Sequence, residues 1–273
     1  MRRAFTLAEV LITLGVIGVV AAMTLPTLIN RTHNKELHTA FLKTYSELNQ
    51  LALLYVADNG ISVSQDAGGK GSVAGSTIPN GIKSEIANKI FGYYRGAASV
   101  GGSIMGTDDG EGNFIPWYAM NTLNGKKFSG GLNSTGRDSS FLCDNSAFLN
   151  NLTGALLVLN DAPLQGQNGP VVCVDINGQK GPNRFGVDYF LFIFTVDGRV
   201  LPMGQEHKNN PLPCTNSNGS CGNFSNVGSE YCSNTATNYT NNTSCAYYAL
   251  ANIHPTEAGK DYWNDFVGEV YKR

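Results

Sequence analysis

The segment DINGQKGPNRFGVD, at positions 175–188, concentrates side chains that could bind a metal ion. Its candidate ligands are Asp175, Asn177, Asn183 and Asp188. Carboxylate and amide oxygens are the hard ligands that calcium takes, so these four residues are candidates for a calcium site. The segment is not an EF-hand, because Gln179 and Gly186 occupy its fifth and twelfth positions. The glycines and Pro182 favour instead a sharply folded loop whose asparagines bond their own backbone, and the calcium site stays open as the alternative.

A second unusual side chain is Glu9, a carboxylate within an apolar run. Residues 5–25 would form about 31 Å of helix, which matches the hydrocarbon thickness of a bilayer. A carboxylate inside such a helix is expensive and is functional by default. No basic residue lies three or four positions away on the same face, which carries Phe5, Ile12 and Thr13. We therefore expect the neutralising charge to come from outside the helix, for example from an α-amino group freed by cleavage before Phe5 of a neighbouring copy.

Residues typical of catalysis are scattered along the chain. The four histidines are His33, His38, His207 and His254. The sequence contains no nucleophile elbow, zinc-protease pair or dinucleotide-binding glycine set. We therefore expect no enzymatic activity and no required cofactor.

The cysteines predict disulfide bonds. All six lie in the second half of the chain, at Cys143, Cys173, Cys214, Cys221, Cys232 and Cys245. Their spacing fits no zinc module, and an even number in loop-rich sequence indicates disulfides and an oxidising compartment. Six cysteines allow about 15 pairings. Sequence proximity favours the pairs Cys143–Cys173, Cys214–Cys221 and Cys232–Cys245, and buried free thiols are the alternative.

The composition is that of a glycine-rich chain of low charge. The 273 residues fit one or two domains. Glycine contributes 32 residues, and charged residues make up only 15%, so turns and loops are favoured over helices. The net charge of -2 gives no general attraction to nucleic acid or to acidic lipid.

Hydrophobic periodicity predicts an amphipathic helical segment after the apolar run. Its apolar positions step by three and four: Leu37, Phe41, Tyr45, Leu48, Ala52 and Tyr55. Asn59-Gly60 would end the helix, because glycine readily adopts the left-handed C-terminal conformation. The two segments would make one helix of about 54 residues, roughly 80 Å long, whose outer half needs a sheet to pack against.

Four segments in the second half of the chain have the composition of β-strands. The predicted strands are residues 155–160, 171–176, 189–196 and 199–203. Asp197-Gly198 would form a hairpin turn between the last two. Residues 62–77 are expected to be a loop, and short helices are expected at 84–94 and near the C-terminus. The pattern predicts an α+β fold, with the long helix across one face of an antiparallel sheet and a disulfide-rich C-terminal region.

The N-terminal sequence RRAFTLAEVLITLGVIGVVAAM resembles the class III leader and N-terminal helix of type IV pilins and type II secretion pseudopilins. The resemblance implies that a prepilin peptidase cuts between Ala4 and Phe5, that the new terminus is N-methylated, and that Glu9 assists assembly. Pro26 matches a family proline that bends the helix where it leaves the membrane. The chain departs from the family at Ala4, where glycine is usual.

The resemblance extends to the loop at residues 175–188. Loops of similar pattern recur in pseudopilin-like proteins, and some pseudopilins bind calcium in a C-terminal loop. The chain as a whole is then expected to divide into a leader at 1–4, a transmembrane and filament-core helix at 5–29, an amphipathic continuation at 30–60, a globular α+β domain at 61–205 and a Cys-rich extension at 206–273.

The charge distribution predicts a single-pass orientation. Arg2 and Arg3 precede the apolar run, so the positive-inside rule places them in the cytoplasm and everything after Thr27 outside. The run is longer than the roughly 7 to 15 apolar residues of a cleaved secretory signal.

These observations predict a structural subunit, a pilin or pseudopilin, of a bacterial type IV pilus or type II secretion filament. Its length and Cys-rich end favour a minor subunit. The expected partners are copies of itself, other pilin-like subunits, the prepilin peptidase, an inner-membrane assembly platform and the lipid bilayer, and no nucleic acid is indicated. The protein would start in the inner membrane and move to a filament at the cell surface or in the periplasm. The alternative is a membrane-anchored extracytoplasmic ligand-binding or adhesion module that does not polymerise, in which Glu9 snorkels to the interface.

Overall fold

The computed structural model describes residues 6–69, 84–99, 107–108, 114–115, 123–124, 147–150, 152–160, 162–163, 165–178, 180–205, 228–235 and 242–270. The helices are α1 (Leu7–Asn59), α2 (Val63–Ala67), α3 (Ser84–Gly92), α4 (Cys245–Ala251) and α5 (Val267–Val270), with a 3-10 turn η1 (Ser229–Tyr231) and a π-helical turn η3 (Tyr262–Phe266). The strands are β1 (Ala97–Ser99), β2 (Thr107–Asp108), β3 (Phe114–Ile115), β4 (Ala147–Asn150), β5 (Leu156–Leu159), β6 (Val171–Asp175), β7 (Tyr189–Phe194) and β8 (Val200–Pro202).

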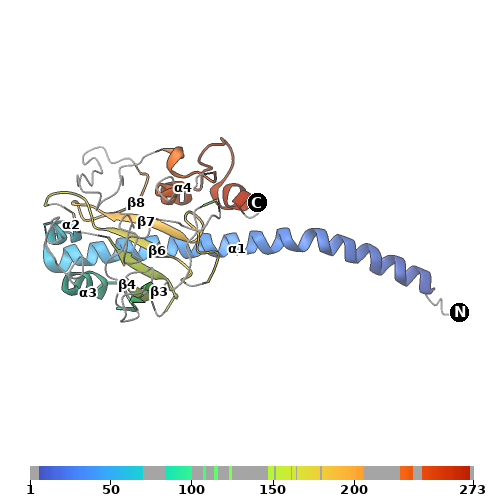
Figure 1. Ribbon diagram of the computed structural model, residues 1–273, viewed down its shortest axis with the longest axis horizontal. Helices are drawn as coiled ribbons and strands as arrows, with labels where there is room; N and C mark the ends of the chain where they lie inside the picture. The colour runs from blue at the N-terminus through green and yellow to red at the C-terminus, as the bar shows by residue number, and fades with distance from the viewer. Residues whose placement is uncertain are drawn as a thin grey trace.

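Helix α1 is a single helix of 53 residues, as the sequence predicts. It begins after Thr6, whose side chain accepts a hydrogen bond from the backbone N–H of Glu9. It ends at Gly60, which has a left-handed φ of 70°. Both ends therefore satisfy backbone groups that have no partner within the helix. Pro26 lies inside the helix without ending it, and Figure 1 shows the N-terminal part of α1 curving away from the rest.

Six antiparallel strands form the central sheet in the order β1-β4-β5-β6-β7-β8. Strands β5 to β8 confirm the four predicted strands, with ends that agree within two residues. Asp197-Gly198 joins β7 to β8, and Gly198 has the positive φ that this turn requires. Strands β1 and β4, and the separate pair β2-β3, are additions to the predicted set.

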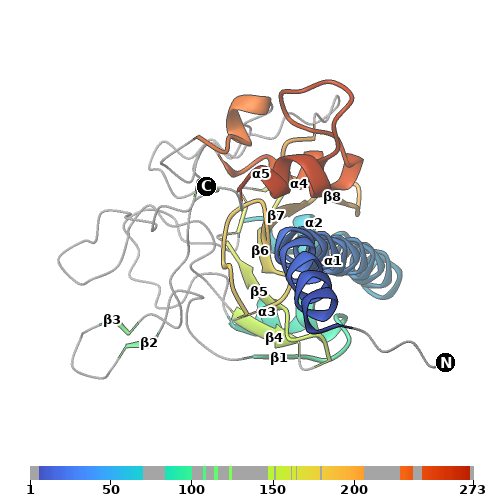
Figure 2. The same cartoon turned by 90° about the vertical axis from the view of Figure 1, so that its right-hand side faces the viewer.

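The amphipathic half of α1 packs on one face of this sheet, as Figure 2 shows in a view along the helix. Tyr45 is half-buried, and the other residues of the predicted stripe are buried. The ring of Phe41 lies 4.6 Å from that of Phe190 and 5.6 Å from that of Phe192. Because Phe190 and Phe192 are two residues apart on β7, their side chains share the face that α1 covers. The fold is therefore α+β, as predicted.

The C-terminal elements pack into the same core. Trp263 of η3 stacks on the ring of His38 at 5.1 Å and lies 5.7 Å from Phe41. The side chain of Asn34 donates a hydrogen bond to the Trp263 carbonyl oxygen at 2.8 Å. These contacts fix the C-terminal segment beside α1, a few residues beyond the apolar half of the helix.

Two helices lie where the sequence prediction placed none. Helix α2 falls in the range 62–77, which the prediction assigned to loop, and its first turn is closed by reciprocal hydrogen bonds between Ser62 and Gln65. Residues 70–77 lie outside the described residues. Helix α4 lies against β7 and β8. The predicted helix at 84–94 is confirmed as α3, and the predicted C-terminal helix is η3 followed by α5.

Candidate functional site

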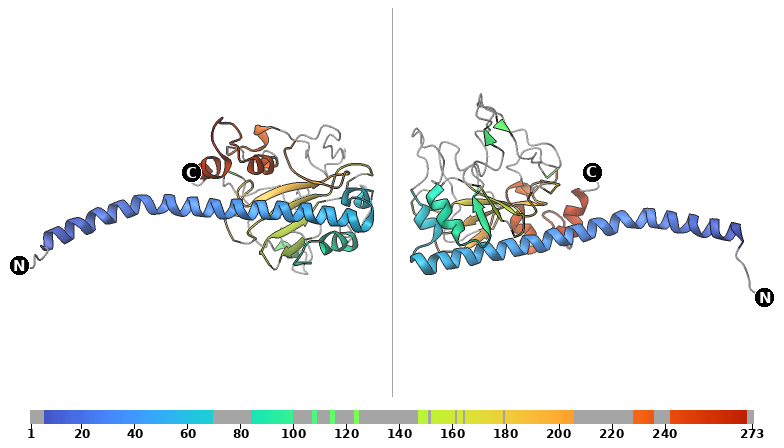
Figure 3. Two further views of the ribbon diagram at one scale, coloured as in Figure 1. Left: turned by 180° about the vertical axis from the view of Figure 1, so that it is seen from behind. Right: turned by 90° about the horizontal axis from the view of Figure 1, so that it is seen from below.

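The apolar half of α1, which we define as residues 7–29, projects beyond the sheet and the other helices (Figure 3). Among the described residues, α1 is the one helix long and apolar enough to cross a membrane, and its most apolar stretch buries nothing against the rest of the chain. Leu7 is 79% exposed and Met23 is 73% exposed. A surface this apolar needs a bilayer or other apolar helices around it.

Glu9 caps the start of this helix. Its Oε2 accepts hydrogen bonds from both the backbone N–H and the hydroxyl of Thr6, each at 2.8 Å. Its own backbone N–H donates to the Thr6 hydroxyl oxygen at 3.3 Å, which completes a reciprocal capping box. Oε1 accepts no hydrogen bond from the described residues. The carboxylate is therefore held by one oxygen, while the other is open to a group from outside.

The capping box is a contact of Glu9 that the sequence prediction did not include. Thr6 binds the carboxylate from the start of the same helix. The pattern T-x-x-E of Thr6 to Glu9 was the signal for this cap. Thr6 carries no charge, so the expectation of a neutralising charge stays a prediction. Ala4 and Phe5, the predicted cleavage pair, lie outside the described residues.

The predicted calcium ligands lie together in the loop between β6 and β7. Asp175 and Asp188 are fully buried. Asp188 accepts hydrogen bonds from the backbone N–H groups of Asn183 at 2.8 Å and Arg184 at 2.6 Å, and the side chain of Asn177 also bonds to it. Asp175 accepts a hydrogen bond from the N–H of Asn177 at 3.3 Å.

These hydrogen bonds are the ones expected of a self-bonded loop. They do not exclude an ion, because each carboxylate oxygen has two lone pairs. The Oδ1 atom of Asn177 is buried and has no hydrogen-bond partner within the described part of the chain. Burial raises the pKa of Asp188 to about 6, against the opposing effect of the Arg184 and Asn183 N–H groups. The four residues therefore fit calcium in ligand type and proximity, and calcium binding stays a prediction.

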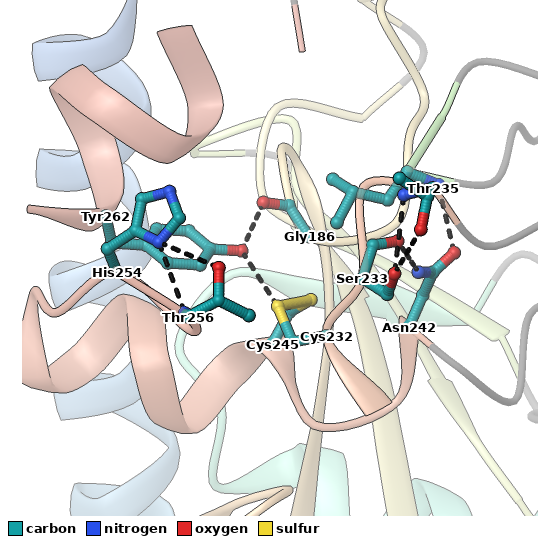
Figure 4. The surroundings of a disulfide bond; sticks show 10 residues. Gly186, Cys232, Ser233, Thr235, Asn242, Cys245, His254, Thr256 and Tyr262 are labelled. Carbon is teal, nitrogen blue, oxygen red and sulfur yellow. Dashed lines mark hydrogen bonds between the residues drawn. A yellow bond between two sulfur atoms is a disulfide. The ribbon is translucent and has the colours of Figure 1, made fainter. Parts of the chain in front are cut away.

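A disulfide bond anchors the C-terminal segment beside this loop (Figure 4). Cys232 and Cys245 are bonded, which confirms one predicted pair. The buried Tyr262 hydroxyl donates a hydrogen bond to the Gly186 carbonyl oxygen at 2.6 Å. A Cβ on Gly186 would stand 2.9 Å from the Cys245 Sγ, so glycine is needed for the approach of the disulfide.

The other predicted pairs involve cysteines outside the described residues. Cys173 on β6 is disulfide-bonded, and its partner is one of Cys143, Cys214 and Cys221, none of which is described. The pairs Cys143–Cys173 and Cys214–Cys221 therefore stay predictions. His207 also lies outside the described residues.

A cluster around His254 was missed by sequence reasoning. Its buried Nε2 lies 3.7 Å from Oε1 of Glu257 and 4.0 Å from Oε2 of Glu269, an arrangement that could hold a metal ion by residue type. However, Nδ1 accepts hydrogen bonds from the backbone N–H groups of Thr256 at 3.2 Å and Glu257 at 3.0 Å, which places the proton of the neutral ring on Nε2. Nε2 then offers an N–H and no lone pair. Because Lys260 also bridges the two carboxylates at 2.8 and 3.4 Å, the cluster is a polar network rather than a metal site.

The described geometry defines a class of protein by shape: a long, apolar N-terminal helix packed by its second half on an antiparallel sheet, which is a pilin-like architecture. Comparison with protein-family models, curated proteins and solved structures finds no match for the chain.

Proposed function

We propose that this protein is a structural subunit, a pilin or pseudopilin, of a type IV pilus or type II secretion filament. The observation that carries the proposal is the division of α1 into two halves with different surroundings. The most apolar stretch of residues 7–29 buries nothing against the rest of the described chain, whereas the stripe from Leu37 to Tyr55 is packed on the sheet. Such a helix can anchor the subunit in a bilayer and later pack against the same helices of other subunits when it leaves the bilayer.

Glu9 would direct the assembly. In the bilayer or in a bundle of apolar helices, an unpaired carboxylate is strongly disfavoured. The capping box holds Glu9 by Oε2 at the first turn and leaves Oε1 open. The amine created by cleavage before Phe5 of a neighbouring subunit supplies the opposite charge at the same depth. The apolar surface then provides the attraction between subunits, and Glu9 sets their relative position.

The test replaces Glu9 by valine in the full chain, in cells that carry the assembly machinery. We expect Glu9→Val to insert in the membrane normally but to be lost from sheared filaments. Thr13→Val is the matched control, because it also replaces a polar side chain of the same helix one turn later, and it should assemble. The mass of the mature N-terminal peptide tests the cut before Phe5 and its methylation. A chain that keeps its first four residues and stays dispersed in the membrane would favour the anchored, non-polymerising alternative.

A further inference from the structure

A short loop near the C-terminus, residues 254–260, is held closed by the side chain of its first residue, His254 (Figure 4). Nδ1 of His254 accepts hydrogen bonds from the backbone N–H groups of Thr256 at 3.2 Å and Glu257 at 3.0 Å. The backbone N–H of His254 donates to the Lys260 carbonyl oxygen at 3.0 Å, which closes the base of the loop. Most of the loop is exposed, so the bonds to one imidazole nitrogen hold a segment that buries little surface of its own.

The other nitrogen of the imidazole faces a group of charged side chains. Nε2 is buried and has no hydrogen-bond partner among the described residues. It lies 3.7 Å from Oε1 of Glu257 and 4.0 Å from Oε2 of Glu269, and no other ion pair of this ring occurs in the described part of the chain. Lys260 bridges the two carboxylates, 2.8 Å from Glu257 and 3.4 Å from Glu269. Two carboxylates and one ammonium leave one negative charge in excess while the imidazole is neutral.

Protonation of the ring affects its two nitrogens in opposite ways. An imidazolium donates from both nitrogens and accepts at neither. At Nε2 the positive charge is favourable, because it offsets the excess negative charge and a small movement brings a carboxylate oxygen within hydrogen-bond distance. At Nδ1 the added proton faces the N–H groups of Thr256 and Glu257, so both bonds to the loop are lost. The ring also packs edge-on against Phe266 at 5.1 Å, a contact that either protonation state can make.

We propose that the loop at residues 254–260 is a pH-sensitive switch, closed when His254 is neutral and open when it is protonated. Imidazole ordinarily changes its charge between about pH 5 and 8, so mild acidification operates the switch. Opening is local, because the elements on both sides stay anchored, α4 by the Cys232–Cys245 disulfide and η3 by the contacts of Trp263 with α1. The inference does not depend on the proposed function, since it requires no second subunit.

Hydrogen exchange of the full chain in detergent tests the switch. The exchange rates of peptides that cover residues 255–260 are compared at about pH 7.5 and about pH 5.5, after correction for the intrinsic effect of pH on exchange. We expect the protection of these amides to fall about tenfold at the lower pH, while the protection of β6 and β7 is unchanged. Protection that is equal at both pH values, or that is lost in the sheet as well, would overturn the inference.

Three variants separate His254 from other groups that titrate in this range. Asparagine can accept the same two backbone bonds through its side-chain oxygen but takes no proton, so His254→Asn should keep the loop protected at both pH values. His33→Asn is the matched control, because it removes an imidazole of α1 and should leave the wild-type loss of protection unchanged. Glu269→Gln removes one partner of the imidazolium and should move the midpoint of opening to lower pH. A loss of protection in His254→Asn equal to that of the wild type, or an unchanged midpoint in Glu269→Gln, would refute the switch.

Discussion

Glu9 has two properties that substitutions can separate, its charge and its hydrogen bonds to Thr6. Glu9→Gln keeps a side chain that can close the capping box but removes the charge. Thr6→Ala removes the cap, worth about 1 kcal/mol of helix stability, but keeps the charge. If the carboxylate pairs with a neighbouring amine, Glu9→Gln removes the attraction between the two charges, whereas Thr6→Ala keeps it. Glu9→Gln should then weaken association well beyond the roughly fivefold effect that the loss of the cap at Thr6 can have.

The assay is the fraction of each variant in sheared filaments, relative to the amount in the membrane. Alkaline extraction of the membrane shows that each variant is inserted, so that a loss from filaments is a loss of assembly. We expect Glu9→Gln to be nearly absent from filaments and Thr6→Ala to be present at a reduced level. If Glu9→Gln assembles like the wild type, the charge has no role. If Thr6→Ala fails as completely as Glu9→Gln, the carboxylate acts as a helix cap.

Three further predictions concern the core and the loop at residues 175–188. Phe41→Ala should lower the free energy of unfolding by about 3 to 5 kcal/mol in a urea titration, because it empties a fully buried site, whereas Leu42→Ala on the exposed face should change it by less than about 0.5 kcal/mol. Burial raises the pKa of Asp188 to about 6, so the folded state binds the carboxyl proton more tightly than the unfolded state does. The stability that this proton contributes is complete below about pH 4 and is lost as the pH rises through 6. The urea midpoint should therefore fall less steeply with rising pH for Asp188→Asn than for the wild type. Equal falls in the two proteins would contradict the raised pKa of Asp188. Calcium, but not magnesium at the same concentration, should raise the unfolding temperature at neutral pH, and chelation or Asp188→Asn should abolish the rise; an unchanged temperature would leave the self-bonded loop as the full description.

Strands β5 to β8 of the sheet and the long helix could be predicted because their signals are local. The run at β7 is short, rich in aromatic and β-branched residues, and followed by Asp197-Gly198. The stripe from Leu37 to Tyr55 has helical spacing and is the face that meets the sheet. In both cases the side chains that form the core also determine the secondary structure. One hydrophobic pattern therefore predicts both the element and the face that it buries.

The polar contacts that the sequence prediction missed are of two kinds. The capping boxes at Thr6 and Ser62 are local and readable, since each follows the pattern S/T-x-x-E/Q, but one lies beside an apolar run and the other in glycine-rich sequence. The cluster at His254 is different, because Glu269 comes from α5 and reaches the imidazole only when the C-terminal segment folds back. No local pattern encodes that contact, so only the tertiary structure could show it.

Pairing Glu9 with the amine at residue 5 of another copy also fixes the geometry of the contact. It places the two helices about 6 Å out of step, because four residues separate the levels. The return pair, from Glu9 of the second copy to the amine of the first, needs the opposite shift, so two copies can make only one of these pairs. The contact therefore extends into a filament instead of closing into a dimer. A stable dimer that makes both pairs at once would disprove this geometry.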